Sequence, residues 1–471
     1  MPDDEYSGVL TTAEHHAREW LNSVAERPIE PEATPDEIKD ALGRAFPDEG
    51  ADPVAVVELL ATAIEPGLIA MPSPRFYGFV IGGTHPAGLG ADWLVSAWDQ
   101  NTGSRAPTPG TAAVEELAAS WLLDLFGLPA ESGVGFVTGA TMANFACLVA
   151  ARGEVLRRAG WDVERDGLQG APRVRFFAGD AVHSSMVAAG RMAGLGMPRT
   201  VGADGEGRID VDGLAAALAE GDGGEEDGLV EAGPAIVALQ AGDVHSGAFD
   251  DFAAAIEVAH AAGAWVHIDG AFGLWAGASP SLRHLVAGFE RADSWATDAH
   301  KTLNTPYDCG IAIVADESAM VRALGAHASY LPVPGAISEP YDRTPELSRR
   351  ARGVPVWATL RALGRHGVAD LVDGLAAAAR GLADGFTRIP GLEVLNEVVF
   401  TQVCVAAEDD ATTAALVEGL RHDGVVWASP SRWNGRGIVR FSVSNRGTDA
   451  TAVARTVDTV ERVLGEVRAG R

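Results

Sequence analysis

The sequence predicts an α/β protein built on an open, mostly parallel sheet. Short apolar runs typical of buried strands alternate with helical segments, as in PAIVALQ before the helical pattern at 252–262 and AWVHI after it. Each helix can return the chain across the sheet, which favours parallel neighbours. Ligands of such sheets bind beyond the carboxyl ends of the strands, so functional residues are expected there.

The length of 471 residues and the even apolar content predict two lobes that share an interface. We expect a helical arm over residues 1–75, a large domain over 76–350 and a small C-terminal α/β domain over 351–471. The arm contains short helical patterns at 9–26, 35–44 and 52–65. Because such helices bury little surface alone, the arm is expected to pack across a partner subunit; a plain N-terminal subdomain is the alternative.

The formal net charge of −29 argues against nucleic acid and anionic membranes as partners. Neither a long apolar run nor a leader-like N-terminus occurs, so membrane spanning and export are not expected. Cys147, Cys309 and Cys404 are isolated, which predicts neither disulfides nor a zinc site and fits a reducing cytoplasm. The acidic stretch at 219–233 lacks the spacing of a calcium loop, and no metal is expected.

Lys301 is notable because lysine is rare in this chain. Lys39 and Lys301 are the only lysines among 36 lysine and arginine residues. Arginine stays protonated and forms no imine, whereas a neutral ε-amine can do so. Lys301 directly follows His300 and precedes the strand pattern GIAIVA, a setting that favours a buried cleft. A Schiff-base lysine is therefore the sharper hypothesis, and a chance surface lysine is the alternative.

The stretch GFVTGATMAN predicts a strand, a small-residue turn and a helix that begins near Thr141. The N-terminus of such a helix offers free N–H groups and a positive dipole end, so Gly139, Ala140 and Thr141 could seat a phosphate. Neither GxGxxG nor a Walker lysine occurs, which argues against dinucleotides and triphosphates. An ordinary strand-to-helix turn is the alternative.

Other polar residues follow the remaining predicted strands. His183 comes after RVRFFAG, Asp243 and His245 follow PAIVALQ, and Asp269 ends WVHID. A histidine such as His183 is more often a neighbour of a helix cap than a catalyst. Together with Thr141 and Lys301, however, these residues all fall just beyond strand ends. This convergence predicts one ligand site at that edge of the sheet.

The motifs TGATMAN, DAVHSS, HIDGAFG and DAHKTLNTPYDCG resemble those of the pyridoxal-phosphate-dependent group II amino acid decarboxylases. The resemblance extends over nearly the whole chain. It implies the fold of the aspartate aminotransferase superfamily, with a mostly parallel seven-stranded sheet in a large domain that binds pyridoxal 5'-phosphate (PLP). It also implies a homodimer with active sites at the subunit interface.

The resemblance assigns roles residue by residue. Lys301 would hold PLP as a Schiff base, Asp269 would pair with the pyridinium nitrogen, and His183 would stack on the ring. A carboxylate at the ring nitrogen keeps it protonated, which lets the ring accept electrons. The other positions implied at the cofactor are Gly139, Ala140, Thr141, Asp243, Ala271, Asp298 and His300. This chain departs from many relatives at Met142, Asp243 and Asp298, and an anionic Asp298 near phosphate would have to turn away or be screened by a donor.

Residues 326–352 are rich in proline and resemble the mobile loop of the family, whose tyrosine delivers a proton. Tyr330 is the first candidate and Tyr341 the second, whereas a plain lobe connector is the alternative. For the substrate pocket we expect Phe76, Tyr77 and Phe79, which suit an apolar or aromatic side chain. His245 would suit an acidic or hydroxylated one, and Arg352 could meet the substrate carboxylate, although an exposed cation at a helix start is the commoner situation.

The sequence thus predicts a cytoplasmic, homodimeric enzyme that removes the α-carboxyl group of an L-amino acid as CO₂ and releases the amine. One alternative is an oxidative reaction in which O₂ converts the substrate to an aldehyde. Another is a PLP-binding protein without catalysis, which the joint presence of Lys301, Asp269 and His183 disfavours. The side chain of the substrate stays open.

Overall fold

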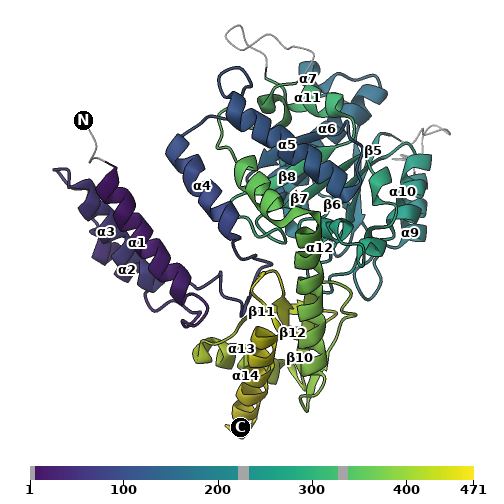
Figure 1. Cartoon of the computed structure of the whole chain (residues 1–471). Coiled ribbons are helices and arrows are strands. Elements are labelled where there is room, and N and C mark those ends of the chain that lie inside the picture. Colours follow the sequence, from purple (N-terminus) through teal and green to yellow (C-terminus); the bar gives the residue numbers. More distant parts are fainter. Residues whose placement is uncertain (1–5, 221–232, 327–337, 471) are drawn as a thin grey trace.

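A computed structural model describes residues 6–220, 233–326 and 338–470 (Figure 1). Its centre is a seven-stranded sheet in the order β2-β8-β7-β6-β5-β3-β4. Strand β8 runs antiparallel to both of its neighbours, and the other pairs are parallel. The strands are β2 (Gly133–Val137), β3 (Arg175–Gly179), β4 (Arg199–Val201), β5 (Ala235–Gln240), β6 (Trp265–Asp269), β7 (Ser294–Asp298) and β8 (Gly310–Val314). The prediction of a mostly parallel sheet is confirmed.

Helices cover both faces of this sheet because its central strands are buried on both sides. Alternate strand residues enter two different cores, as Ile236 and Val237 do on β5. One core contains α6 (Ala140–Arg158), α8 (Ser184–Met192) and α11 (Glu317–Leu324). The other contains α5 (Pro109–Phe126), α9 (Val211–Ala219), α10 (Phe252–Ala261) and the start of α12 (Gly353–Phe386).

A second, five-stranded sheet forms the small domain, in the order β1-β11-β12-β10-β9. Its strands are β1 (Phe76–Tyr77), β9 (Leu392–Val394), β10 (Gln402–Ala407), β11 (Trp427–Trp433) and β12 (Arg436–Ser442), packed with α13 (Asp410–Asp423) and α14 (Ala450–Ala469). Strand β1 joins this sheet although its residues fall within the range expected for the large domain.

Helix α12 connects the two domains (Figure 1). It leaves helical geometry at Gly364, where φ is 63° and ψ is 178°. A glycine meets this backbone conformation without the steric cost that a side chain would add. Helix α12 therefore consists of two segments joined at a kink.

The N-terminal arm contains α1 (Ser7–Ser23), α2 (Pro35–Leu42) and α3 (Pro53–Ile64), and it extends away from the large domain (Figure 1). Thr34 and Glu37 form a capping box that starts α2. None of the three helices contains a buried residue. The predicted helices are confirmed, and the packing of the arm across a partner subunit stays a prediction.

The remaining elements are short or connect these layers. They are α4 (Pro86–Trp98), α7 (Val163–Asp166), η1 (Glu65–Gly67), η2 (Gly273–Ala278), η3 (Arg283–Val286), η4 (Phe289–Arg291) and η5 (Pro340–Arg343). Within the described ranges, no helix combines the length and apolarity that a bilayer crossing requires.

Candidate active site

Six of the seven strands end at one edge of the large sheet. Strands β2, β3, β4, β5, β6 and β7 point the same way, because β8 alone is reversed between β2 and β7. Residues singled out from the sequence lie at or just after these ends: Gly139, His183, Asp243, Asp269 and Lys301. The sheet therefore gathers a lysine, a carboxylate, a histidine and a helix start in one region, as the alternation of elements predicts.

Asp269 is the last residue of β6 and is buried. Burial raises the pKa of its carboxyl group, and the nearby charges of His183 and Lys301 oppose that increase. Oδ1 accepts the N–H of Ala271 at 3.2 Å, and Oδ2 accepts the side-chain amide of Asn144 at 2.9 Å. Asp269 is thus held in a fixed orientation by donors behind it.

Lys301 follows β7 by three residues, and its Nζ lies 3.0 Å from Oδ2 of Asp298. Asp298 is buried, and Nε2 of His300 lies 3.6 Å from the same oxygen. Nδ1 of His300 accepts the N–H of Cys309, which leaves the proton of a neutral ring on Nε2. The carboxylate expected to turn away from a phosphate is therefore directed at the amine of Lys301.

Tyr307 covers His300 with its ring. The two ring centroids lie 4.2 Å apart at an interplanar angle of 26°, which is a stacked arrangement. Tyr307 is itself exposed. This contact, which the sequence did not predict, holds the imidazole of His300 against Asp298.

The helix start expected to seat a phosphate is present. Helix α6 begins at Ala140, and Gly139 provides no side-chain cap, so the first N–H groups of the helix lack an intrahelical partner. A Cβ at Gly310 would lie 2.4 Å from the carbonyl carbon of Gly139, so strand β8 must carry glycine there. This close approach of β8 fixes the position of the turn at Gly139.

His183 is the N-cap residue of α8. Its Nδ1 accepts the N–H of Ser185 at 3.2 Å, as the helix-cap interpretation predicts, and the residue is exposed. A pocket of about 560 Å³ brings His183, Asp243 and His245 together. Oδ1 of Asp243 accepts the N–H groups of His245 and Ser246, so this oxygen closes a turn. The role of Asp243 at a cofactor stays a prediction.

Phe76 and Tyr77 do not line a substrate pocket. Phe76 stacks on Trp427 in a small core beside the arm, and Tyr77 is fully buried in the small domain. The hydroxyl of Tyr77 lies 2.8 Å from that of Thr456. The expectation for these two residues was wrong because they form the edge strand of a distant sheet.

Phe79 differs from its two neighbours because its side chain is 59% exposed. Phe79 and Val80 both have positive φ, 54° and 58°, which is costly for residues with side chains. The segment then passes Lys301 so closely that a Cβ at Gly82 would lie 2.1 Å from the carbonyl oxygen of Lys301. Phe79 therefore stays a candidate for substrate contact.

Two further candidates, Tyr341 and Arg352, lie shortly before α12 or at its start. Arg352 donates from Nε to Asp308 at 2.8 Å, so its guanidinium already has a carboxylate partner. Tyr341 is 3% exposed, which argues against it as a proton donor to substrate. Tyr330 lies outside the described residues, and its role stays a prediction.

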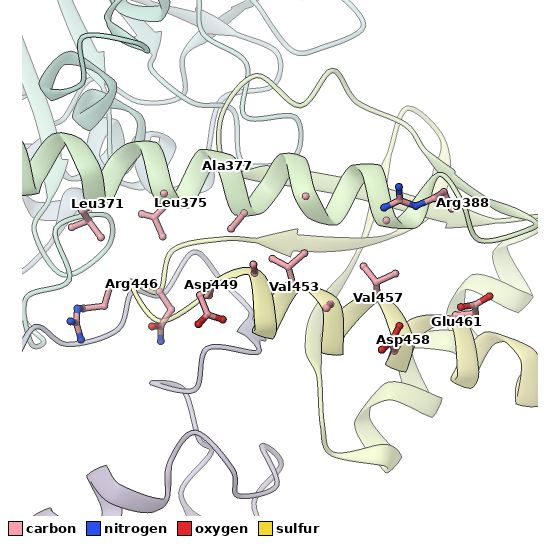
Figure 2. Close-up of a pocket in the computed structure, with 18 of the residues that line it drawn as sticks. Leu371, Leu375, Ala377, Arg388, Arg446, Asp449, Val453, Val457, Asp458 and Glu461 are labelled. Atoms are coloured by element: carbon pink, nitrogen blue, oxygen red, sulfur yellow. The ribbon is translucent and has the colours of Figure 1, made fainter.

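Figure 2 shows a groove of about 860 Å³ in the small domain, between α12 and α14. Leu375 and Ala377 on α12 face Val453 and Val457 on α14, and Glu461 lies toward one end. Its lining residues include no lysine, histidine or cysteine. This groove therefore lacks the amine that the chemistry of Lys301 requires, and the strand ends of the large sheet remain the candidate site.

The sequence model of a family described as pyridoxal-dependent decarboxylase conserved domain matches residues 35–408. The match spans most of the chain, including every strand of the large sheet. The chain belongs to the pyridoxal-dependent decarboxylase family. Its enzymes are carboxy-lyases that use PLP, so the resemblance noted in the sequence and the cofactor that it implies are both confirmed.

Relatives in this family cover nearly the whole chain. Tryptophan decarboxylase 1 of Oryza sativa subsp. japonica is 28% identical over 475 residues, with 94% of this chain and 90% of that protein covered. Aromatic-L-amino-acid decarboxylase of Sus scrofa is 26% identical over 468 residues, with 96% and 94% covered. A crystal structure of Oryza sativa TDC with PLP and tryptamine matches with a TM-score of 0.89 at 26% identity, covering 99% of this chain and 98% of that one.

The residues of this pyridoxal-dependent decarboxylase fit the group that the family uses. PLP presents an aldehyde, a ring nitrogen and a phosphate, and each needs a different partner. The strand ends offer an amine in Lys301, a buried carboxylate in Asp269 and open N–H groups at the start of α6. The donor set thus matches all three parts of the cofactor.

The sequence reasoning missed several residues of this decarboxylase. Asn144 and His267 are fully buried polar residues behind Asp269. Asn304 is also fully buried, and its side chain bonds to Gly83, Lys301 and Ser444. A polar residue inside an apolar helix or strand pattern is the signal that could have identified Asn144 and His267, because buried polar groups require partners.

Proposed function

We propose that this chain decarboxylates an L-amino acid to the corresponding amine and CO₂, with Lys301 as the residue that bonds covalently to PLP. The observation that carries the proposal is the convergence of Lys301, Asp269 and His183 at the carboxyl ends of β7, β6 and β3. The other lysine, Lys39, is on the exposed helix α2, beside Asp36.

Each residue has a defined task in this proposal. PLP, when bound, supplies the electron sink that accepts the electron pair left as CO₂ departs. Asp269 would accept a hydrogen bond from the protonated ring nitrogen, and the N–H groups at the start of α6 would bind the phosphate. His183, an exposed residue, would stack on the ring. Ala271 stays the candidate for the opposite face.

We further propose that the substrate carries an aromatic side chain. The support is that the relatives with nearly complete coverage are named for tryptophan, tyrosine and aromatic L-amino acids. Phe79, exposed beside the Lys301 segment, is the local residue that would contact such a ring. An acidic substrate is the second candidate, since a mouse acidic amino acid decarboxylase is 27% identical over 377 residues.

The direct test is to incubate the purified PLP-bound enzyme with each standard amino acid and L-DOPA and to quantify CO₂, amine and aldehyde. Equal amounts of CO₂ and amine from an aromatic substrate are expected. Borohydride reduction followed by peptide mapping should find the pyridoxyl group on Lys301. An adduct on Lys39, or no adduct, would remove Lys301 from the proposal.

The oxidative alternative is tested at Tyr330. After CO₂ leaves, the substrate Cα must gain a proton, and a phenol can deliver it before O₂ reacts there. Tyr330→Phe should therefore slow amine formation and release some aldehyde, ammonia and peroxide. Tyr341→Phe is the matched control, because burial keeps Tyr341 from substrate. Unchanged amine production by Tyr330→Phe would exclude Tyr330 as the donor.

We also propose a homodimer whose active sites lie at the subunit interface, in the cytoplasm. Large apolar side chains are exposed on the arm and on α4, and such surfaces mark protein contacts. They include Leu10, Leu21, Val56, Leu59, Leu60, Trp93, Leu94 and Trp98. The three cysteines are free, which agrees with a reducing compartment.

A further inference from the structure

A chain of buried hydrogen bonds lies behind Asp269. Asn144 on α6 donates to Asp269, and Oδ1 of Asn144 lies 2.9 Å from Nε2 of His267. Nδ1 of His267 lies 2.9 Å from Oγ of Ser294, which also accepts the indole N–H of Trp265 at 2.9 Å. All five side chains are buried, and they come from α6, β6 and β7.

We assign the direction of the hydrogen bonds from the Asp269 end, where the amide of Asn144 donates to the carboxylate. The indole of Trp265 can only donate, so Ser294 accepts from it and has its own O–H free to give. His267 is neutral, because burial lowers its pKa to about 3. A neutral ring has one donor and one acceptor nitrogen, and Asn144 must turn its oxygen toward His267 in order to aim its NH₂ at Asp269. Donation therefore runs from Trp265 through Ser294, His267 and Asn144 to Asp269.

The direction of donation matters because this chain of hydrogen bonds ends at the carboxylate of Asp269. Burial penalises an ionised Asp269, and the donors that oppose this penalty from the protein side are Asn144 and the N–H of Ala271. If the chain ran the other way, Asn144 would present its oxygen to Asp269. Two acceptors would then face each other unless Asp269 took up a proton. A protonated Asp269 could not accept the ring proton of PLP at that oxygen.

We propose that Trp265, Ser294, His267 and Asn144 form a one-directional relay that keeps Asp269 ionised and aimed at the cofactor. These four are positioning residues, because Asp269 alone would touch the ring. The inference rests on the proposed function in one respect, the contact between Asp269 and the ring nitrogen. It extends that proposal to Ser294, which is three hydrogen bonds away from Asp269 and is fully buried.

A cofactor analogue separates this role from ordinary core packing. 1-Deaza-pyridoxal phosphate has carbon in place of the ring nitrogen and is otherwise matched to PLP. Dissociation constants of both compounds are measured on the cofactor-free full chain by fluorescence titration. The wild-type protein should prefer PLP by roughly tenfold to a hundredfold, the range of a charge-assisted hydrogen bond. A packing defect would weaken the binding of both compounds alike and leave the ratio of their dissociation constants unchanged.

The variants are Asn144→Leu, Ser294→Ala and Ser294→Thr. Asn144→Leu and Ser294→Ala should lower the preference for PLP to about threefold or less, and Ser294→Thr, which keeps the hydroxyl, should restore it. Ser279→Ala is the matched control, since Ser279 is equally buried but bonds to Asp373 outside the relay. Thermal unfolding of each cofactor-free variant shows that it is folded.

Two results would overturn the relay. One is a wild-type preference that Ser294→Ala and Asn144→Leu both retain in full. The other is an equal loss of preference in Ser279→Ala. Absence of any preference in the wild-type protein would instead contradict the contact between Asp269 and the ring nitrogen. The failure of the relay and the failure of the proposed function are therefore distinguishable.

Discussion

The amine of Lys301 lies 3.0 Å from Oδ2 of Asp298, a buried carboxylate whose Oδ1 has no hydrogen-bond partner among the described residues. The Asp298 side chain is 2% exposed and that of Lys301 is 20% exposed. The ion pair therefore offsets the free-energy cost of burying the Asp298 carboxylate. The side chain of Lys301 is still partly exposed. Lys301 thus has a structural task in the cofactor-free protein besides its proposed chemistry.

Substitutions of Lys301 should separate these two tasks. Lys301→Ala leaves Asp298 unpaired and should lower the free energy of unfolding of the cofactor-free protein by about 2 kcal/mol, less than a fully buried pair would cost. Lys301→Arg keeps a cation beside Asp298 and should stay within about 1 kcal/mol of wild type. Both should lose the borohydride-trapped adduct. Urea unfolding measures the stabilities, and equal values for the two variants would contradict the structural task.

His267 should make the protein sensitive to acid. Burial lowers the pKa of His267 from its ordinary value of 6.5 to about 3 in the folded protein. Between these values the unfolded chain binds a proton that the folded protein does not bind. The free energy of unfolding should therefore fall as the pH falls from 6.5 toward 3, by up to about 1.4 kcal/mol per pH unit from this group.

The measurement is urea unfolding across that pH window for wild type and His267→Gln, which cannot take up the proton. The contribution of Asp250 has the opposite sign, because burial raises its pKa to about 6 and stability from that group is lost as the pH rises through 6. Asp250 is present in both proteins, so the difference between the two curves isolates His267. Parallel curves would refute the assignment.

Asn304 should stabilise the contact between the two domains. Its Oδ1 accepts the N–H groups of Gly83 and Arg446, and its Nδ2 donates to the carbonyl groups of Lys301, Thr302 and Ser444. Asn304→Gly should cost about 2–4 kcal/mol because these buried groups lose their partner.

Comparison with Asn304→Ala tests the backbone at the same position. Asn304 has φ of 59°, which glycine adopts freely and alanine does not. Alanine should therefore cost about 1 kcal/mol more than glycine. Thermal and urea unfolding measure both effects. Equal stability of the glycine variant and the wild type would show that the hydrogen bonds of Asn304 contribute nothing.

The exposed apolar face of α3 should hold two subunits together. Val56→Glu combined with Leu60→Glu places charge on that face and should shift the protein from dimer to monomer in sedimentation velocity. Thr62→Glu is the control, because Thr62 is exposed and lies two residues beyond Leu60, on a different side of the same helix. A wild-type protein that sediments as a monomer, or a double variant that remains a dimer, would contradict the proposed interface.

Local patterns carried the prediction of the fold and of part of the site. Strand and helix periods identified the sheet, and the ends of those strands located Lys301, Asp269 and Gly139. Patterns within one segment do not reveal contacts between segments that are distant in the sequence. Tyr77 has the appearance of a pocket aromatic, yet its backbone pairs with β11 some 350 residues later in the chain. Asn144 and His267 meet across a helix and a strand, and no spacing rule in either segment predicts that meeting.

The contact between Gly139 and Gly310 sets a practical limit on engineering this enzyme. Any side chain at position 310 would displace the turn that begins α6, whatever amino acid is to be accepted as substrate. Libraries aimed at new substrates should therefore leave position 310 unchanged. Phe79 and Tyr330, the proposed substrate-contact and proton-donor residues, are the positions to vary instead.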